Sequence, residues 1–396
     1  VDVFLDKTVI AGNRAHGAGG GIAIKGGSLC LRGSEVSGNT VETAEGNSRK
    51  YAIGGGAAVS EGVIVVVPSI DEQLTQSKYV DDCLLSDAAQ AAFVDISPEF
   101  PEAVTLIALN PEGIDIIKSA VTGNTASVRT SDGNTPDVQM VVGGGLASVS
   151  DAPVEVPSWI KYSPVPRPVG ISVFQAEISD NKALVYNVDL TGGGTVQAAG
   201  GGLFVGQPRG VAPRADIVQS VVSGNEITVG ETLEGGADIT SVVGAGVGTV
   251  SSHEWYSEFG GFWESSGASP GGGTDEKSKY KSPAVYLSTS TVTGNTITAN
   301  QIESTANALI MGGGVGMFSY GEQDGINRDQ YQNPVAFSFL SVVSENSIDV
   351  KRSNDSAVAN TSLAVVGGGI GVVDFNSQFG TLNLSKYVGY FSAMVG

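Results

Sequence analysis

Two short sequence phrases alternate along the chain, and each has a fixed order of apolar and polar positions. The first is an aliphatic residue, usually Ser or Thr, usually Gly, and then Asn, as in Val36-Ser37-Gly38-Asn39. Its seven copies end at Asn13, Asn39, Asn124, Asn181, Asn225, Asn295 and Asn346. The second is a glycine run leading into an aliphatic segment, and its seven copies begin at Gly19, Gly54, Gly143, Gly200, Gly244, Gly312 and Gly367. This alternation predicts a repeat architecture.

Apolar residues alternate with polar residues on both sides of each Asn. In the second copy, Leu29 and Leu31 lie ten and eight residues before Asn39, and Val41 lies two residues after it. A period of two is typical of β-strands. The Asn comes three residues after the aliphatic residue, an odd step that would put the two side chains on opposite faces of a straight strand. The chain must therefore bend between them, and Gly and Asn are residue types that tolerate the left-handed backbone of such a bend.

Each repeat is therefore predicted to contain a strand, a corner with Asn, a second strand, a variable loop, a glycine corner, a third strand and another variable loop. The seventh repeat carries its apolar pair at Phe337 and Phe339, which predicts a register slip of one residue. One repeat cannot bury its own apolar face, but coils stacked about 4.8 Å apart share a continuous core. We predict an all-β fold, a right-handed parallel β-helix of about seven coils, as a single domain over residues 1–396.

Stacked coils would place the seven asparagines in a ladder, each side-chain amide bonding its neighbour and the local backbone. Taken singly, such an Asn is also explained by turn chemistry, and a glycine triplet by a flexible linker. Seven copies in fixed register favour the ladder and the glycine corners. We interpret both sets as structural and assign no catalytic residue.

Length variation is concentrated between the glycine-run strand and the next repeat, with insertions predicted at 61–113, 151–170, 251–283 and 319–334. Every coil places this slot at the same angle, so the insertions should gather on one side of the rod, the side that solenoids commonly use for binding. The insertions hold all three tryptophans. The candidate contacts with a partner protein or a glycan are Trp159, Trp255, Tyr256 and Trp263. The same side chains could instead pin each insertion to the wall of the β-helix.

The paired phrases resemble the repeats of the chlamydial polymorphic outer-membrane proteins, in which an aromatic-x-x-Asn element alternates with Gly-Gly-Ala and an aliphatic residue. Here Val or Ile stands at the aromatic position, as in Val36-Ser37-Gly38-Asn39, and the glycine element is Gly-Gly-Gly-aliphatic, as in Gly312 to Val315. The resemblance implies a β-helix like that of the pectin lyases. It also implies display at a cell surface and a role in adhesion. Similar repeats occur in large surface proteins of algae and other protists.

Composition narrows the classes of partner. The chain has 56 glycines in 396 residues and a formal net charge of −20. That charge repels nucleic acids and anionic lipid surfaces, so we expect neither as a partner. No apolar run is long enough to span a membrane, so we expect no direct membrane insertion.

Two cysteines and three glycosylation motifs bear on the compartment. Cys30 and Cys83 are too few for a four-cysteine zinc site, and they form either one disulfide in a secreted protein or two buried thiols. The Asn-x-Ser/Thr motifs predict glycan attachment at Asn354, Asn360 and Asn383 if the protein is secreted by a eukaryote.

Residues for catalysis are sparse. His16 and His253 are the only histidines, so a zinc site or a Ser-His-Asp triad has little support. The adjacent acidic pair Asp81-Asp82 lies in an insertion, and the companion motifs of a polygalacturonase are absent. We expect no metal centre, no enzymatic activity and no cofactor beyond weak calcium binding by acidic loops.

These observations predict a non-enzymatic structural or adhesive component of an extracellular or cell-surface assembly or filament. The β-helix would be a stiff scaffold, and the insertions its contact loops. We expect other subunits as partners, either further copies of the chain or paralogues, in a longer chain or an assembly, with glycans as further ligands. The alternative is a β-helix that binds or cleaves a polysaccharide by lyase or hydrolase chemistry.

Overall fold

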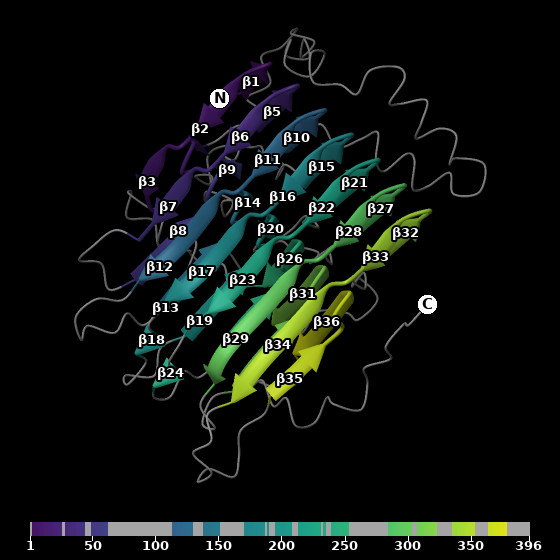
Figure 1. The fold of residues 1–396 in the computed structure, drawn as a ribbon. Helices are drawn as coiled ribbons and strands as arrows, with labels where there is room; N and C mark the ends of the chain where they lie inside the picture. The colour runs from purple at the N-terminus through teal and green to yellow at the C-terminus, as the bar shows by residue number, and fades with distance from the viewer. Residues whose placement is uncertain are drawn as a thin grey trace, which may run out of the picture.

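The computed structural model describes fifteen segments of the chain. These are residues 2–25, 28–43, 49–61, 113–129, 138–150, 170–186, 188–189, 195–207, 213–230, 233–234, 239–252, 284–302, 307–322, 335–352 and 363–377. Within them the chain forms only β-strands and turns, and it winds through successive coils from the purple N-terminal end to the yellow C-terminal end (Figure 1).

The strands of successive coils stack in register into five main parallel sheets, which we name A to E in the order in which each coil visits them. Sheet A contains β1 (Asp2–Asp6), β5 (Ser28–Arg32), β10 (Ile114–Ile117), β15 (Gly170–Phe174), β21 (Arg214–Val218), β27 (Ala284–Ser288) and β32 (Val335–Phe339). Sheet B contains β2 (Val9–Ala11), β6 (Glu35–Ser37), β11 (Ala120–Thr122), β16 (Glu177–Ser179), β22 (Val221–Ser223), β28 (Thr291–Thr293) and β33 (Val342–Ser344). Sheet C contains β3 (Arg14–His16), β7 (Thr40–Glu42), β12 (Thr125–Arg129), β17 (Lys182–Tyr186), β23 (Glu226–Val229), β29 (Thr296–Ile302) and β34 (Ser347–Arg352).

The return half of each coil lies in the other two sheets. Sheet D contains β8 (Arg49–Ile53), β13 (Val138–Val142), β19 (Thr195–Ala199), β25 (Ile239–Val243), β30 (Asn307–Met311) and β35 (Leu363–Val366). Sheet E contains β4 (Ile22–Lys25), β9 (Ala57–Glu61), β14 (Leu146–Ser150), β20 (Leu203–Gln207), β26 (Val247–Ser252), β31 (Val315–Glu322) and β36 (Ile370–Ser377). A small pair, β18 (Val188–Asp189) and β24 (Leu233–Glu234), joins two neighbouring coils. The fold is a parallel β-helix of seven coils, as predicted.

Each full coil has five strands where the sequence predicted three. The aliphatic-Ser/Thr phrase is itself a short strand in sheet B, because the chain turns just before it at a residue with positive φ, such as Lys118 (φ 49°) or Gln175 (φ 49°). Sequence reasoning missed this corner because, apart from Gly33, the residue there is not a glycine. It also missed sheet D, whose strands lie in the segment that the sequence predicts to be a variable loop.

The predicted register slip in the seventh coil is wrong. β32 pairs with β27 in the common register, Val285 opposite Ala336 and Leu287 opposite Ser338. Phe337 therefore lies on the outer face, where its ring is 6.1 Å from that of Tyr286. Compared with the other strands of sheet A, β32 therefore has its large apolar residues on the outer face, although its backbone pairs in the common register.

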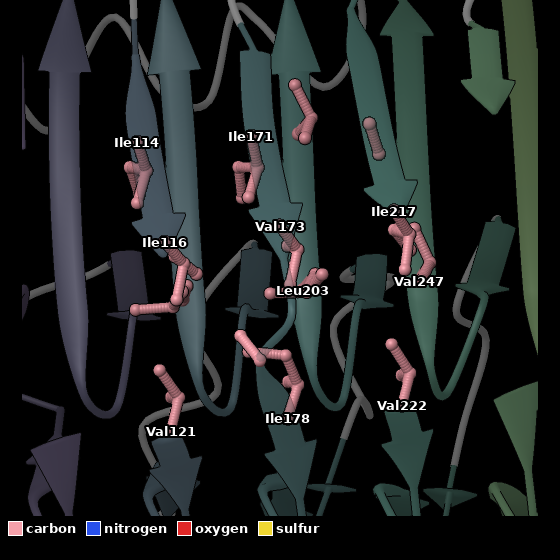
Figure 2. Close-up of a cluster of buried hydrophobic side chains, with 14 of the residues drawn as sticks. Ile114, Ile116, Val121, Ile171, Val173, Ile178, Leu203, Ile217, Val222 and Val247 are labelled. Atoms are coloured by element: carbon pink, nitrogen blue, oxygen red, sulfur yellow. The ribbon is translucent and has the colours of Figure 1, made fainter. Parts of the chain in front are cut away.

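The core consists of columns of hydrophobic side chains, most of them aliphatic, along the helix axis. The inner faces of sheets A, B and E form the first column set, in which Ile116, Val173 and Ile217 succeed one another in adjacent coils (Figure 2). A second set lies between sheets C and D, and a third occupies the opposite faces of D and E, which meet at the glycine corner. Because side chains of one column are contributed by successive coils, no coil has a core of its own.

Each long insertion follows a strand of sheet E and precedes a strand of sheet A. The insertions therefore occur at the predicted point of the repeat. The predicted boundaries need correction. Residues 319–322 belong to β31, residues 251–252 to β26, Glu61 to β9 and Gly170 to β15. The strands extend into these segments because pairing with the neighbouring coil continues there, as Glu322 pairs with Ser377.

A second polar ladder, not predicted, lies at the corner between sheets A and B. Its members are Thr8, Ser34, Ser119, Ser220, Ser290 and Ser341. The hydroxyl of each serine accepts a hydrogen bond from a backbone N–H of the preceding coil, as from Ser34 N to Ser119 Oγ at 3.0 Å. The ladder is interrupted in the fourth coil, where Ala176 offers only a methyl group to the N–H of Ser119.

We expect Ala176→Ser to stabilise the protein by about 0.5–1.5 kcal/mol, the usual net value of one buried hydrogen bond. The new hydroxyl would accept from Ser119 N–H and donate to the carbonyl two residues earlier, as Ser220 does at 2.7 Å. The measurement is the free energy of unfolding in urea. Ala176→Val, which adds volume without a hydroxyl, is the control, and equal gains from both variants would contradict the ladder.

Candidate functional site

The seven asparagines form one column along the corner between sheets B and C. From coil to coil, the backbone N–H and the side-chain Nδ2 of each Asn both donate to Oδ1 of the next, at 2.8–3.1 Å. All links have the same polarity, with donors on the N-terminal side. From Asn39 to Asn295 the column is fully buried.

An interior member of this ladder uses its whole hydrogen-bonding capacity. Asn181 Oδ1 accepts from N–H and Nδ2 of Asn124, while its own Nδ2 donates to Asn225 Oδ1 (3.0 Å) and to the carbonyl of Val121 (2.9 Å). A primary amide has two donors and two acceptor lone pairs, so no valence is left for a substrate. The interior ladder is therefore a structural element.

The glycine corners lie directly against this ladder, which explains why the two sequence phrases alternate. The first glycine of each run has positive φ, 61–65°. The third packs on an Asn of the next coil, so that a Cβ added to Gly145 would lie 2.9 Å from Cγ of Asn181. The same contact recurs between Gly202 and Asn225. A side chain at the third position would push the asparagine column apart.

The main titratable cluster in the described residues lies on the outer face of sheet A. The outward positions of consecutive coils form a row: Phe4, Cys30, Asp115, Ser172, Asp216, Tyr286 and Phe337. Arg214 bonds Asp216 (Nε to Oδ1, 2.8 Å) and lies over the Tyr286 ring at 4.7 Å from its centroid. This row passes from an aromatic residue through two carboxyl groups to two more aromatic residues.

The two carboxyl groups of the row are buried to different extents, since Asp216 is fully buried and Asp115 is partly buried. Burial raises the pKa of Asp115 to about 7, although a hydrogen bond with Ser172 acts in the opposite direction. Burial also raises the pKa of Asp216, against the opposing charge and hydrogen bond of Arg214. Ser172 lies between the two aspartates in the strand order, so their Cα atoms are two strand spacings, about 9.6 Å, apart.

We expect Asp115→Asn to raise the melting temperature near pH 8 and to leave it close to wild type near pH 4. The pKa of Asp115 in the folded protein lies above its ordinary value of 3.8, so ionisation costs stability as the pH rises from about 4 to about 7. Thermal unfolding of both proteins across this range measures the difference.

The control variant should change the melting temperature in the opposite direction. A hydrogen bond from Arg32 lowers the pKa of Asp6, so Asp6→Asn should lower the melting temperature slightly at neutral pH and leave it unchanged in acid. A gain for Asp115→Asn that is the same at both pH values would contradict the assigned cause.

Sequence reasoning singled out the acidic pair Asp81-Asp82 and overlooked Asp115 and Asp216. A signal was present: both aspartates lie nine residues before their Asn, at the polar position between the two apolar residues of the sheet A strand. Equal register places them on one face of the same sheet. Asp81 and Asp82 lie outside the described residues.

The structure places few of the other candidate residues. Cys30 is fully buried in β5 and disulfide-bonded; Cys83, the only other cysteine of the chain, lies outside the described residues. His16 is exposed in β3. The remaining candidates outside the described segments are Trp159, Trp255, Tyr256, Trp263, His253, Asn354, Asn360 and Asn383.

Two further features are absent from the described segments. No group of three or more His, Cys, Asp or Glu side chains is arranged to hold a metal ion there. The same segments contain no helix long and apolar enough to cross a membrane. In comparisons with known proteins, no family model, no curated protein and no solved structure matches this chain.

Proposed function

We propose that the protein is a non-enzymatic structural or adhesive component of an extracellular surface assembly, with the β-helix as a stiff scaffold. The observation that carries this proposal is the fully bonded interior asparagine ladder. Five consecutive buried amides, Asn39 to Asn295, are linked to their neighbours by two hydrogen bonds each way. Such a column resists both bending and separation of the coils, because opening any one junction leaves buried polar groups unpaired.

Two features support an extracellular location. The disulfide at Cys30 is of a kind that persists in oxidising compartments and is rare in the cytosol. The long insertions each join a strand of sheet E to a strand of sheet A, and such a repeated slot suits lateral contacts with other subunits or with glycans. The aromatic residues of those connections, such as Trp255 and Trp263, are the contacts that we propose there.

The location is tested by labelling cells with an antibody raised against the purified protein. We expect labelling of intact, unpermeabilised cells and of the surface material extracted from them. Labelling that requires permeabilisation would overturn the proposed location, and with it the proposed role. A parallel labelling of a cytosolic protein of the same cells controls for membrane integrity.

A second candidate function, cleavage of a polysaccharide, is favoured by the row on sheet A. Inverting glycosidases hold an acid and a base about 6.5–9.5 Å apart, and Asp115 and Asp216 lie two strands apart on one face, beside Arg214 and Tyr286. Against this candidate, Asp216 is 3% exposed, so a sugar could not reach it without displacing what covers it.

The two candidates are separated by incubating the purified protein with pectin, alginate and neutral glycans and measuring new reducing ends and unsaturated products. The scaffold proposal expects no turnover. The control is Asp349→Asn, which changes an aspartate of sheet C outside the row. The enzymatic proposal would replace the scaffold proposal if turnover is retained in this control but abolished in both Asp115→Asn and Asp216→Asn.

A further inference from the structure

The outer face of sheet A is buried in the second and third coils. In β5 the outward side chains Ser28 and Cys30 are 3% and 0% exposed, and in β10 the outward Ile117 is 9% exposed. In sheet B of the same coil as β5, by contrast, the outward Glu35 is exposed. An outward side chain of a sheet loses contact with water only where other parts of the chain pack on that face. The outer face at β5 and β10 is therefore a docking surface that is occupied.

The occupant is not part of the hydrophobic core already described. Neither Cys30 nor Ile117 belongs to any of the three sets of core columns. The described strands that pack against sheet A belong to sheet E, as β9 packs against β5, and they contact its inner face. The burial of the outer face thus needs a separate explanation.

The disulfide bond at Cys30 identifies the occupant. Cys30 is disulfide-bonded, and the only other cysteine of the chain is Cys83, in the insertion between β9 and β10. A disulfide holds the two Cα atoms about 5–6 Å apart. A bond between these two cysteines places the insertion directly over the outer face of β5.

The connections of this insertion agree with that position. Residues 62–112 follow β9, which packs against β5, and precede β10, which pairs with β5 (Figure 1). The insertion therefore begins and ends beside the strand that carries Cys30. More than 20 residues lie on each side of Cys83 within it, and 20 extended residues span up to about 70 Å, so the length of chain does not prevent the bond.

The sequence around Cys83 matches the docking surface in polarity. Leu84 and Leu85 directly follow Cys83, and Val80 lies three residues before it. Packing such residues beside Ile117 removes apolar surface of both partners from water.

We propose that residues 62–112 dock on the outer face of sheet A of their own chain, at β5 and β10, anchored by a disulfide bond between Cys83 and Cys30. This inference goes beyond the proposed function and does not rest on it. It separates this insertion from the other long ones, since none of the three tryptophans lies in it. A partner that approaches the second and third coils from this side meets residues 62–112 in place of sheet A.

The first test maps the disulfide. The purified monomer is treated with an alkylating reagent, digested without reductant and analysed by mass spectrometry. We expect one linked pair of peptides, containing Cys30 and Cys83, with no alkylation of either residue. Alkylation of both cysteines, or a bond between two copies in a mixture of isotope-labelled and unlabelled protein, would overturn the inference.

The second test asks whether the insertion covers the sheet. The variant replaces residues 62–112 by one glycine. In the first coil three residues separate Lys25 from Leu29, and these residues pair with Ser60 and Ile114. The variant also leaves three residues between Ser60 and Ile114, so the shortened connection reproduces one that the chain already makes. Cys30→Ser in the same variant avoids a free thiol.

The measurement is oxidation of side chains by hydroxyl radicals, read by mass spectrometry of peptides. We expect oxidation of Ile117 to rise several-fold in the variant, because its cover is gone. Val9, which is already 65% exposed, serves as the internal reference and should not change. Circular dichroism should show that the strands of the variant are retained.

The matched control shortens the next insertion in the same way. Replacing residues 151–169 by one glycine leaves three residues between Val149 and Ile171, the positions equivalent to Ser60 and Ile114. Oxidation of Ile117 should stay at the wild-type level in this control. If it rises only in the control, or in neither variant, residues 62–112 are not the occupant and the inference is wrong.

A second design applies if the shortened variant does not fold. Recognition sites for a specific protease, placed at both ends of residues 62–112, allow the insertion to be cut out of the folded full-length chain. The fragment should stay attached without reductant, and its removal after reduction should raise oxidation of Ile117. Loss of the fragment without reductant, or removal with no rise in oxidation, would overturn the inference and leave the proposed function unaffected.

Discussion

Asn181→Ala should lower the free energy of unfolding by about 3–6 kcal/mol. The substitution removes the acceptor of Asn124 N–H and Nδ2 and the donor to the carbonyl of Val121, all fully buried or within the core corner. Each buried group left without a partner costs about 1–3 kcal/mol. Urea denaturation followed by circular dichroism measures the loss.

The matched control is the same change at the end of the ladder. Asn13 is exposed, its side-chain oxygen accepts no bond from the described residues, and its Nδ2 donates only to Asn39 Oδ1, which keeps the bond from the backbone N–H of residue 13 in the variant. Asn13→Ala should therefore cost less than about 1 kcal/mol. Similar costs at the two positions would show that the asparagines act as separate turn residues and not as a column.

Gly143→Ala should destabilise the protein by more than about 4 kcal/mol, in the range reserved for severe backbone conflicts. Gly143 has φ +62°, and an added Cβ would lie 2.3 Å from the carbonyl oxygen of Leu146 and 2.8 Å from Cβ of Ala147. Backbone atoms cannot move aside as a flexible side chain can, so the corner between β13 and β14 would have to open. Thermal and urea unfolding both report the change.

Gly123→Ala provides the comparison, because it changes the same residue type with nearly the same φ (+65°) at the asparagine corner. Nothing lies within 4 Å of a Cβ added there, and Asp180 and Glu345 occupy this position in other coils with φ of 58° and 56°. Only the intrinsic cost of left-handed backbone applies, about 1–2 kcal/mol. If Gly143→Ala costs no more than Gly123→Ala, the close approach at the glycine corner is not a constraint.

The fold could be predicted from the sequence because its periodic elements leave local signals. The corner at Gly38-Asn39 and the corner at Gly54 both require residue types that are easily recognised, and the strand residues around them have a strict period of two. The corner between sheets A and B left no such signal. Lys118, Gln175 and Thr289 adopt positive φ there only because stacking on the neighbouring coils holds them.

The outer face of sheet A was less predictable than the core. A buried outward residue such as Asp216 resembles an ordinary exposed polar residue of an alternating strand, because burial of the outer face depends on parts of the chain far away in sequence. The bond between Arg214 and Asp216 has a spacing of two, which puts both on one face but does not reveal that the face is covered. The alternation of polar and apolar residues therefore predicts which residues share a face of the sheet, but it does not predict whether that face is buried.

Hydrogen exchange of the asparagine backbone amides tests the central claim, a single asparagine column that joins all seven coils, most directly. In the interior, each Asn N–H is bonded to the next Asn Oδ1, whereas Asn346 N–H has no acceptor in the described segments. The column predicts slow exchange, limited by coil opening, for Asn39, Asn124, Asn181, Asn225 and Asn295, and rapid exchange for Asn346. Interior asparagine amides that exchange as rapidly as that of Asn346 would contradict the column.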